Sequence, residues 1–118
     1  VEISPSQVQL AQSHGCDAVR QGDGGQALAD LPAACLDLVV CFDVFEHLSH
    51  DTCAQWFAQI RRVLKPGGRL IGHVPNGLSP FAGAVYWGDL THLWCPVPES
   101  MQVFCRIRRQ ITLELQIG

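Results

Sequence analysis

The chain has 118 residues, and 47% of them are hydrophobic, which is enough apolar material for the core of one globular domain. Eight basic and eleven acidic side chains give a formal net charge of −3, without a long run of either sign. This balance favours neither a nucleic-acid groove nor binding to an anionic membrane, and no apolar run approaches the length of a membrane span.

The six cysteines contain no Cys-x-x-Cys pair. Cys41 and Cys53 fall at strand and helix positions that are expected to be buried, and no cysteine has an adjacent base or helix start that would mark a catalytic thiol. The amino end also lacks the pattern of a secretory leader. Free thiols in a reducing cytoplasm are therefore the expected state.

The first third of the chain is predicted to consist of short elements. Ser4 and Pro5 indicate the start of a helix, with Ser4 as its cap, and Gly15 indicates its end. Residues 18–21 are expected to form a short strand. Residues 24–32 are expected to form a turn with room for one helical turn.

The middle of the chain predicts a strand, a crossover helix and a second strand. The continuous apolar run Leu36–Phe42 is typical of a strand that is covered on both faces. Residues 51–64 have apolar side chains at three- and four-residue steps, which predicts an amphipathic helix with Trp56 and Phe57 in the core. Residues 69–74 are the second strand, and the right-handed crossover rule makes the two strands parallel.

The last third of the chain is less regular. Residues 76–98 combine glycines, prolines and scattered aromatic side chains, which predicts a long lid or binding loop. Residues 100–109 are compatible with a helix. Residues 111–117 alternate strictly between apolar and polar side chains, as a half-exposed strand does.

Two motifs carry a family resemblance. The predicted strand Leu36–Phe42 leads into Asp43-Val44-Phe45-Glu46-His47, and the helix that follows leads from Leu64 into Lys65-Pro66-Gly67-Gly68. This pair resembles the post-strand acidic motif and the Leu-x-Pro-Gly-Gly turn of class I S-adenosylmethionine-dependent methyltransferases. The resemblance implies a Rossmann-like α/β fold with a doubly wound, mainly parallel sheet.

Further positions extend the resemblance to roughly the first hundred residues. Glu2, before Ile3-Ser4-Pro5, is similar to the acid that binds the ribose hydroxyls of the cofactor S-adenosylmethionine, and Asp23 is similar to the acid that meets the adenine amino group. Without this context, Glu2 is an ordinary surface acid and Asp23 an ordinary turn former. The resemblance assigns six residues to the cofactor: Glu2, Ile3, Asp23, Gly24, Phe42 and Asp43.

Within that assignment, Ile3 and Gly24 would sandwich the adenine, while Phe42 and Asp43 would lie toward the methionyl end. The glycine-rich loop of the family precedes its ribose acid, and only one residue precedes Glu2 in this chain. The expectation is therefore a partial domain over residues 1–118 that lacks the first strand and its glycine-rich loop. Residues 1–76 would form its cofactor side, 77–98 its acceptor-side loop and 99–118 a divergent helix and strand.

The acceptor side has two candidate catalytic residues, His92 and His47. An imidazole titrates near neutral pH, so His92 in Asp89-Leu-Thr-His92 would take a proton from an acceptor hydroxyl. Glu46 and His47 would either line the acceptor pocket or cap the following helix. A metal site made of His47, His73 and His92 has no short ligand spacing to support it, so no metal is predicted.

The predicted function is methyl transfer from S-adenosylmethionine to a small-molecule, lipid or sugar-containing acceptor. A nicotinamide-dependent oxidoreductase is an alternative, because an acid after the second strand also binds ribose in dinucleotide folds. A non-catalytic interaction domain is a second alternative. A sheet that lacks its central strand would also expose an edge, which would allow self-association.

Overall fold

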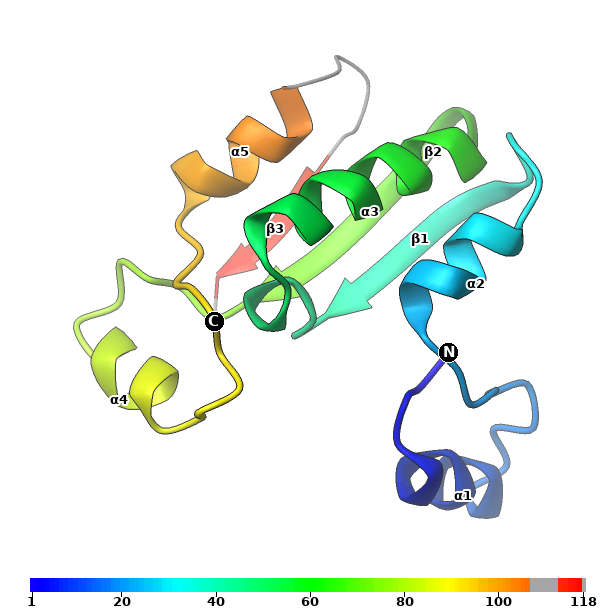
Figure 1. The fold of residues 1–118 in the computed structure, drawn as a ribbon, viewed down its shortest axis with the longest axis horizontal. Helices are drawn as coiled ribbons and strands as arrows, with labels where there is room; N and C mark the ends of the chain where they lie inside the picture. Colours follow the sequence, from blue (N-terminus) through cyan, green and yellow to red (C-terminus); the bar gives the residue numbers. More distant parts are fainter. Residues whose placement is uncertain (107–112, 118) are drawn as a thin grey trace. The chain divides into compact units, whose positions relative to one another are not determined.

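The computed structural model describes residues 1–106 and 113–117, which divide into two compact units, Val1–Pro32 and Ala33–Gly118 (Figure 1). The first unit has two helices, α1 (Pro5–Ser13) and α2 (Gly24–Asp30). Its buried apolar residues are Val8 from α1 and Leu28 from α2. The second unit contains the β-sheet and the remaining helices.

The predicted strand over residues 18–21 is wrong in its extent. Gln21 makes only an isolated parallel bridge with Glu2, held by the Glu2 amide donating to the Arg20 carbonyl at 2.9 Å and the Gly22 amide donating to the Glu2 carbonyl at 3.0 Å. Two backbone hydrogen bonds do not make a regular ladder. They do place Glu2 beside the segment that leads to Asp23.

The caps of the first two helices differ from the prediction. Ser4 is the residue before α1, but its hydroxyl contacts the Ser6 hydroxyl at 3.0 Å and caps no helical amide. The Asp23 carboxylate does cap α2, because it accepts a hydrogen bond from the Gln26 amide at 2.8 Å. Helix α2 consequently extends over seven residues, beyond the single turn that was expected.

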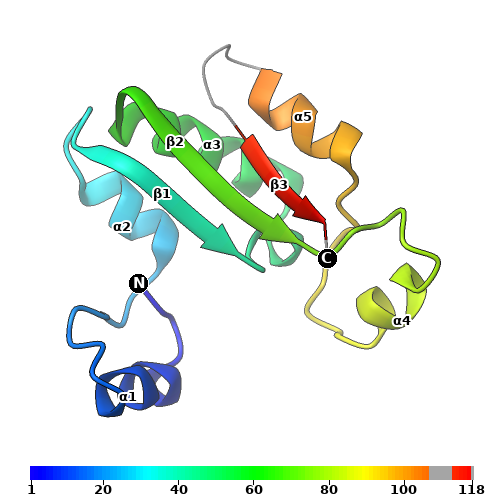
Figure 2. The same cartoon turned by 180° about the vertical axis from the view of Figure 1, so that it is seen from behind.

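The second unit has a three-stranded sheet in the order β1-β2-β3, with both neighbouring pairs parallel, which confirms the predicted parallel α/β fold (Figures 1 and 2). Its strands are β1 (Leu36–Phe42), β2 (Leu64–Val74) and β3 (Leu113–Ile117). Its helices are the 3₁₀ helix η1 (Phe45–His47), α3 (His50–Val63), α4 (Ala82–Trp87) and α5 (Pro98–Arg106).

Helix α3 follows the predicted amphipathic pattern. It begins at His50 because the Ser49 hydroxyl accepts a hydrogen bond from the Thr52 amide at 3.2 Å. The helix packs against β2 and α5, and its buried residues are Cys53, Phe57, Ile60 and Val63. Trp56, expected in the core, is half-buried.

Strand β2 begins five residues earlier than predicted, directly after α3. Leu36 of β1 pairs with Leu64, and Leu38 pairs with Arg69, so the Lys65-Pro-Gly-Gly68 segment forms an irregularity between two regular pairs. Gly67 has a φ of +80°, which a side-chain-bearing residue rarely adopts. The glycines of this turn therefore lie within the early part of the strand instead of before it.

Within the described part of the second unit, no helix covers one face of the sheet, contrary to the expectation that β1 is covered on both faces. Helix α3 lies on one face, and Figure 2 shows the opposite face of β1 and β2 with no helix of the same unit across it. On β1 the exposed fractions are 44% for Leu38, 50% for Val40 and 60% for Phe42. The apolar run has this exposure because the helices of this unit pack on the other face alone.

The carboxyl-terminal part contains one helix that the sequence pattern does not predict. Helix α4 forms within the predicted loop 76–98, and α5 begins two residues before the predicted start at residue 100. Of the predicted elements 100–109 and 111–117, positions 107–112 lie outside the described residues. In the part of the chain that the structure describes, no helix is both long and apolar enough to cross a membrane.

Candidate functional site

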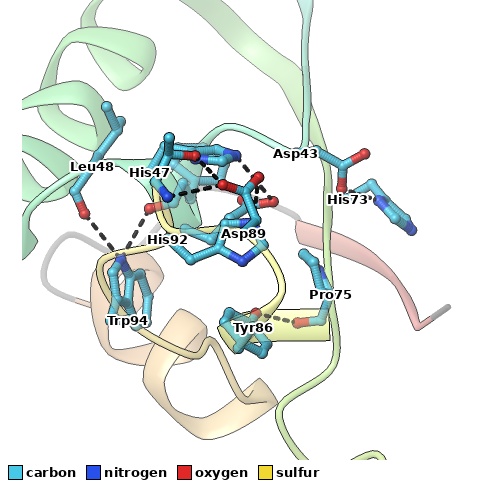
Figure 3. A network of polar contacts seen from close by, with 12 residues as sticks. Asp43, His47, Leu48, His73, Pro75, Tyr86, Asp89, His92 and Trp94 are labelled. Carbon is cyan, nitrogen blue, oxygen red and sulfur yellow. Dashed lines mark hydrogen bonds and ion pairs between the residues drawn. The ribbon is translucent and has the colours of Figure 1, made fainter. Parts of the chain in front are cut away.

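The carboxyl ends of β1 and β2 are joined by the pair Asp43 and His73. The Asp43 amide donates a hydrogen bond to the His73 carbonyl at 2.9 Å, and the Asp43 Oδ1 atom lies 2.7 Å from His73 Nδ1 (Figure 3). Both residues come at the ends of neighbouring parallel strands. This is where open α/β sheets bind their ligands.

Asp43 has an unusual backbone conformation for this position. Its φ is +52°, in the left-handed region that residues other than glycine rarely adopt. The preceding Phe42 is 60% exposed, and its ring meets the His73 ring edge-on at a centroid distance of 6.2 Å. A strained residue and an exposed aromatic side chain at one strand end are typical of a ligand site.

A cavity of about 240 Å³ lies beyond the end of β2. His73 forms part of its wall, and the set of lining residues includes neither His47 nor His92. The other lining residues are Pro75, Asn76, Ser79, Ala82 and Val85. The cavity therefore adjoins the Asp43–His73 pair, and its volume suits a small chemical group.

A second cluster of polar side chains consists of Glu46, His47 and His92. One ligating atom from each of these residues lies within 4.8 Å of the others. Glu46 is fully buried, and neither of its carboxylate oxygens has a hydrogen-bond partner among the described residues. His92 Nδ1 is likewise buried without such a partner. We call these three residues the Glu-His-His cluster.

Three hydrogen bonds attach the loop that carries His92 to η1 and the residue after it, and η1 carries the other two residues of the cluster. The Leu93 amide donates to the Glu46 carbonyl at 2.8 Å. The Trp94 indole donates to the carbonyls of Phe45 at 2.9 Å and Leu48 at 3.0 Å (Figure 3). Residues more than forty positions apart in sequence are thereby held in contact.

A chain of hydrogen bonds orients His47. The Asp89 Oδ1 atom accepts from the Thr91 amide at 2.8 Å and from the Thr91 hydroxyl at 2.5 Å, and the Thr91 hydroxyl lies 2.9 Å from His47 Nδ1. A hydroxyl has one proton to donate, and here Asp89 accepts it. His47 Nδ1 must then be the donor to Thr91, which leaves the lone pair of Nε2 available, 4.0 Å from Glu46 Oε1.

His92 is enclosed by the same loop and by α4. Its Nε2 atom lies 3.7 Å from Asp89 Oδ2, and its ring lies 4.7 Å from the His47 ring and 5.1 Å from the Tyr86 ring, measured between centroids. Tyr86 is itself fixed by its hydroxyl, which donates to the Pro75 carbonyl at 2.8 Å. Figure 3 shows His47, Asp89 and His92 gathered together, apart from the Asp43–His73 pair.

Burial and neighbouring charges shift the pKa values in this region. Burial raises the pKa of Glu46. Burial, with the neighbouring Cys95 and Glu46, also raises the pKa of the Tyr86 phenol. The hydrogen bonds from Thr91 lower the pKa of Asp89 and keep it ionised. The Glu-His-His cluster thus contains the desolvated carboxyl of Glu46 and adjoins the stabilised carboxylate of Asp89.

In the first unit, the two predicted cofactor acids already have local partners. The Glu2 Oε1 atom accepts from the Ser4 amide at 2.8 Å, and Asp23 is the cap of α2. Gly24 is the first residue of that helix, and the Ile3 side chain is 70% exposed. The isolated bridge between Glu2 and Gln21 brings two short parallel segments together. The first segment contains Glu2, and the second leads to Asp23.

In the second unit, the structure brings the predicted His47 and His92 into contact and places Phe42 and Asp43 at one strand end. The interpretation of Glu46 and His47 as helix caps is wrong, because Ser49 is the cap of α3. Sequence reasoning did not identify the buried state of Glu46 or the role of Asp89. The only available signal was the spacing of Asp89 and His92, three residues apart in an irregular segment.

Comparison with known proteins identifies the class of protein. The methyltransferase domain family matches residues 1–72, which is more than half of the sequence, so the chain belongs to this family. A crystal structure of a SAM-dependent methyltransferase from Archaeoglobus fulgidus is similar to 89% of the chain with a TM-score of 0.78 and 20% sequence identity. The chain spans 47% of that protein's length. No curated protein matches the sequence.

Proposed function

We propose that the chain belongs to an enzyme that transfers the methyl group of S-adenosylmethionine to a small-molecule, lipid or sugar-containing acceptor. The match of residues 1–72 to the methyltransferase domain family carries the proposal. Methyl transfer from a sulfonium is an in-line displacement with a neutral leaving group. The protein must therefore mainly hold two ligands in line and accept a proton from the acceptor.

On the adenosine side, Glu2 would accept hydrogen bonds from the ribose hydroxyls and Asp23 would meet the adenine amino group. Ile3 and the backbone at Gly24 would contact the adenine ring. The exposure of Ile3, at 70%, supports this role because a large apolar side chain at a ligand site is free to be covered. The local hydrogen bonds of Glu2 and Asp23 would orient both carboxylates.

On the methionyl side, Phe42 and Asp43 would lie along the cofactor. The left-handed backbone of Asp43 and the exposed ring of Phe42 support this placement. The cavity of about 240 Å³ that adjoins His73 would hold a part of the acceptor other than its reacting hydroxyl, because neither His47 nor His92 lines this cavity. His92 and His47 would act on the acceptor side, with His92 as the proton acceptor.

The six cysteines are free thiols, which favours a reducing compartment such as the cytoplasm as the site of action. Self-association through the outer edge of β1 is a further part of the proposal, since the sheet order places β1 at an edge. Sedimentation velocity at several protein concentrations tests it. A monomer at all concentrations would contradict self-association.

The cofactor proposal is tested by titrating the chain with S-adenosylmethionine and observing backbone amide resonances by NMR. We expect weak binding, with a dissociation constant well above about 1 μM, and shifts centred on Glu2, Asp23 and Asp43. Glu2→Gln and Asp23→Asn should each reduce the affinity. Glu99→Gln, which changes an exposed acid at the start of α5, is the matched control.

A parallel titration with NAD⁺ separates the oxidoreductase alternative. Shifts at the same residues with NAD⁺, but none with S-adenosylmethionine at millimolar concentration, would reject the methyltransferase proposal. Shifts with neither ligand in a folded chain would favour a non-catalytic domain.

A further inference from the structure

The Glu-His-His cluster contains a buried carboxylate that lacks a partner. Glu46 is fully buried, yet both of its carboxylate oxygens are without a hydrogen-bond partner among the described residues. An ionised carboxylate in this state is expensive unless a cation or several donors compensate it. His47 Nε2 is 4.0 Å from Glu46 Oε1, too far to donate a hydrogen bond.

In its neutral form, His47 has a lone pair on the ring nitrogen that lies 4.0 Å from this carboxylate, and His92 has a buried ring nitrogen without a hydrogen-bond partner among the described residues. The Asp89–Thr91–His47 chain places the proton of His47 on Nδ1 and leaves Nε2 as a lone pair. His92 has Asp89 Oδ2 3.7 Å from Nε2, whereas its Nδ1 is buried and unpartnered. Metal-binding histidines characteristically donate their other ring N–H to a carboxylate, carbonyl or hydroxyl partner.

From this geometry we propose that Glu46, His47 and His92 form a binding site for one divalent transition-metal cation. Two imidazole nitrogens and one carboxylate oxygen are a donor set typical of zinc and non-haem iron sites. A cation of either kind would compensate the charge of Glu46, and three protein ligands would leave positions open for an oxygen of water or of an acceptor.

The dimensions of the cluster are compatible with such an ion. The ligating atoms lie within 4.8 Å of one another. In tetrahedral geometry, an ion about 2.1 Å from each ligand places two ligand atoms about 3.4 Å apart, so the widest separation needs to close by up to about 1.4 Å. We expect side-chain rotation of Glu46, His47 and His92 to supply that change.

The neighbouring residues have the properties of an outer shell. The Asp89 carboxylate accepts the Thr91 hydroxyl proton, so the Thr91 oxygen accepts from His47 Nδ1. The Leu93 amide and the Trp94 indole fix the two backbone segments that supply the ligands. The site is therefore largely organised before an ion binds, and its assembly is independent of the proposed methyl transfer.

The test measures binding of Co²⁺ to the 118-residue chain with all thiols kept reduced, using the visible absorption bands of bound cobalt, followed by displacement with Zn²⁺. We expect the unchanged chain to bind one equivalent of Co²⁺ tightly. Glu46→Gln and His92→Gln should each weaken binding by at least about 10–100-fold, since even outer-shell changes have this effect. His14→Ala, at an exposed histidine after α1, is the matched control and should bind as the unchanged chain does.

Thermal unfolding gives a second readout that does not depend on cobalt spectra. Zn²⁺ should raise the Tm of the unchanged chain and of His14→Ala, but not that of Glu46→Gln. Glu46→Gln without metal should be folded, because a neutral amide of the same shape replaces a buried charge. Thr91→Val serves as a further variant, which should weaken binding while retaining all three ligands.

Three results would overturn the proposal. One is the absence of stoichiometric Co²⁺ binding by the folded chain. Another is unchanged affinity in Glu46→Gln and His92→Gln. The third is a near-ultraviolet charge-transfer band of cobalt bound to thiolate that disappears when the cysteines are alkylated, since this would assign the ion to cysteine ligands.

Discussion

The Leu93 amide donates a hydrogen bond of 2.8 Å to the Glu46 carbonyl, and this bond joins the acceptor-side loop to the 3₁₀ helix that follows β1. His92 immediately precedes Leu93, and His47 immediately follows Glu46. The bond therefore determines the approach of the two imidazoles, whose centroids are 4.7 Å apart. Loop and strand end act as one structural element at this site.

The Trp94 indole should contribute measurably to this attachment. Trp94→Phe retains an aromatic ring but removes the N–H that reaches the carbonyls of Phe45 and Leu48. We expect the free energy of unfolding in urea to fall by about 1 kcal/mol. Trp87→Phe is the control, because Trp87 is 81% exposed and its replacement should change stability by less than about 0.5 kcal/mol. Equal effects of the two changes would contradict this role of Trp94.

Gly77 is expected to tolerate no side chain. A Cβ atom at this position would lie 2.7 Å from Cys95 Sγ and 2.9 Å from the Pro96 carbonyl oxygen, and the Gly77 amide donates to that same carbonyl. Gly77→Ala should destabilise the chain by about 1–3 kcal/mol in denaturant titrations, as overpacking does.

Gly83→Ala is the matched control for this substitution. Gly83 lies in α4, and its nearest neighbour to an added Cβ would be Trp87 Cδ1 at 4.0 Å. Alanine is the better helix former, so we expect a gain of about 0.5–1 kcal/mol. If both alanine substitutions destabilised the chain, close packing around residue 77 would not be the cause of the effect of Gly77→Ala.

Alkaline pH should destabilise the chain through Cys41. Burial raises the pKa of this thiol from 9.0 to about 11. A thiol whose pKa is higher in the folded state than in the unfolded state contributes its full stabilisation at pH values below the pKa of the unfolded state. This contribution is lost as the pH rises through the pKa of the folded state. The unfolded chain ionises first, so stability should fall between about pH 9 and pH 11, by up to about 3 kcal/mol from this thiol.

Cys41→Ala should reduce that alkaline loss, measured as the difference in free energy of unfolding between pH 8 and pH 11. Cys16→Ala, at an exposed thiol, should leave the loss unchanged. An alkaline loss in Cys41→Ala as large as in the unchanged chain would assign the effect to other groups.

Substitutions at the cofactor residues and at the acceptor residues should have different effects on cofactor affinity and turnover. This is expected in a chain extended before Val1 by the glycine-rich strand and loop of the family. Replacement of Glu2 or Asp23 should weaken S-adenosylmethionine binding. His92→Ala should leave cofactor affinity nearly intact and lower turnover by roughly 10²–10⁴-fold if His92 removes the acceptor proton. Unchanged turnover in His92→Ala would show that His92 has a structural role and does not act as the general base.

Chelation separates the two roles of His92 in the same extended chain. If His92 is only a general base, a chelator should not affect turnover. If it is a metal ligand, turnover should fall with the chelator and recover with added Zn²⁺ or Fe²⁺. The pH dependence of kcat/KM would then follow the metal site instead of a free imidazole.

The central strand–helix–strand unit could be predicted from the sequence because local patterns determine it. The apolar run at Leu36–Phe42 and the three- and four-residue spacing in residues 51–64 reflect which side chains must be buried. The class of protein could be predicted as well, since the acid after β1 and the Pro-Gly-Gly turn are short contiguous motifs. Helix α4 could not, because its six residues have no regular apolar period.

The open face of the sheet and the Glu-His-His cluster were decided by tertiary structure. Burial of β1 depends on which elements cover its faces, and an apolar run has the same composition whether one face or two are covered. Glu46 and His92 are 46 positions apart, and their contact depends on a backbone hydrogen bond and on the Trp94 indole. Such non-local pairing leaves no periodic signal in the sequence. The two histidines could therefore be predicted individually as candidate site residues. Their position beside one buried carboxylate is a property of the folded chain.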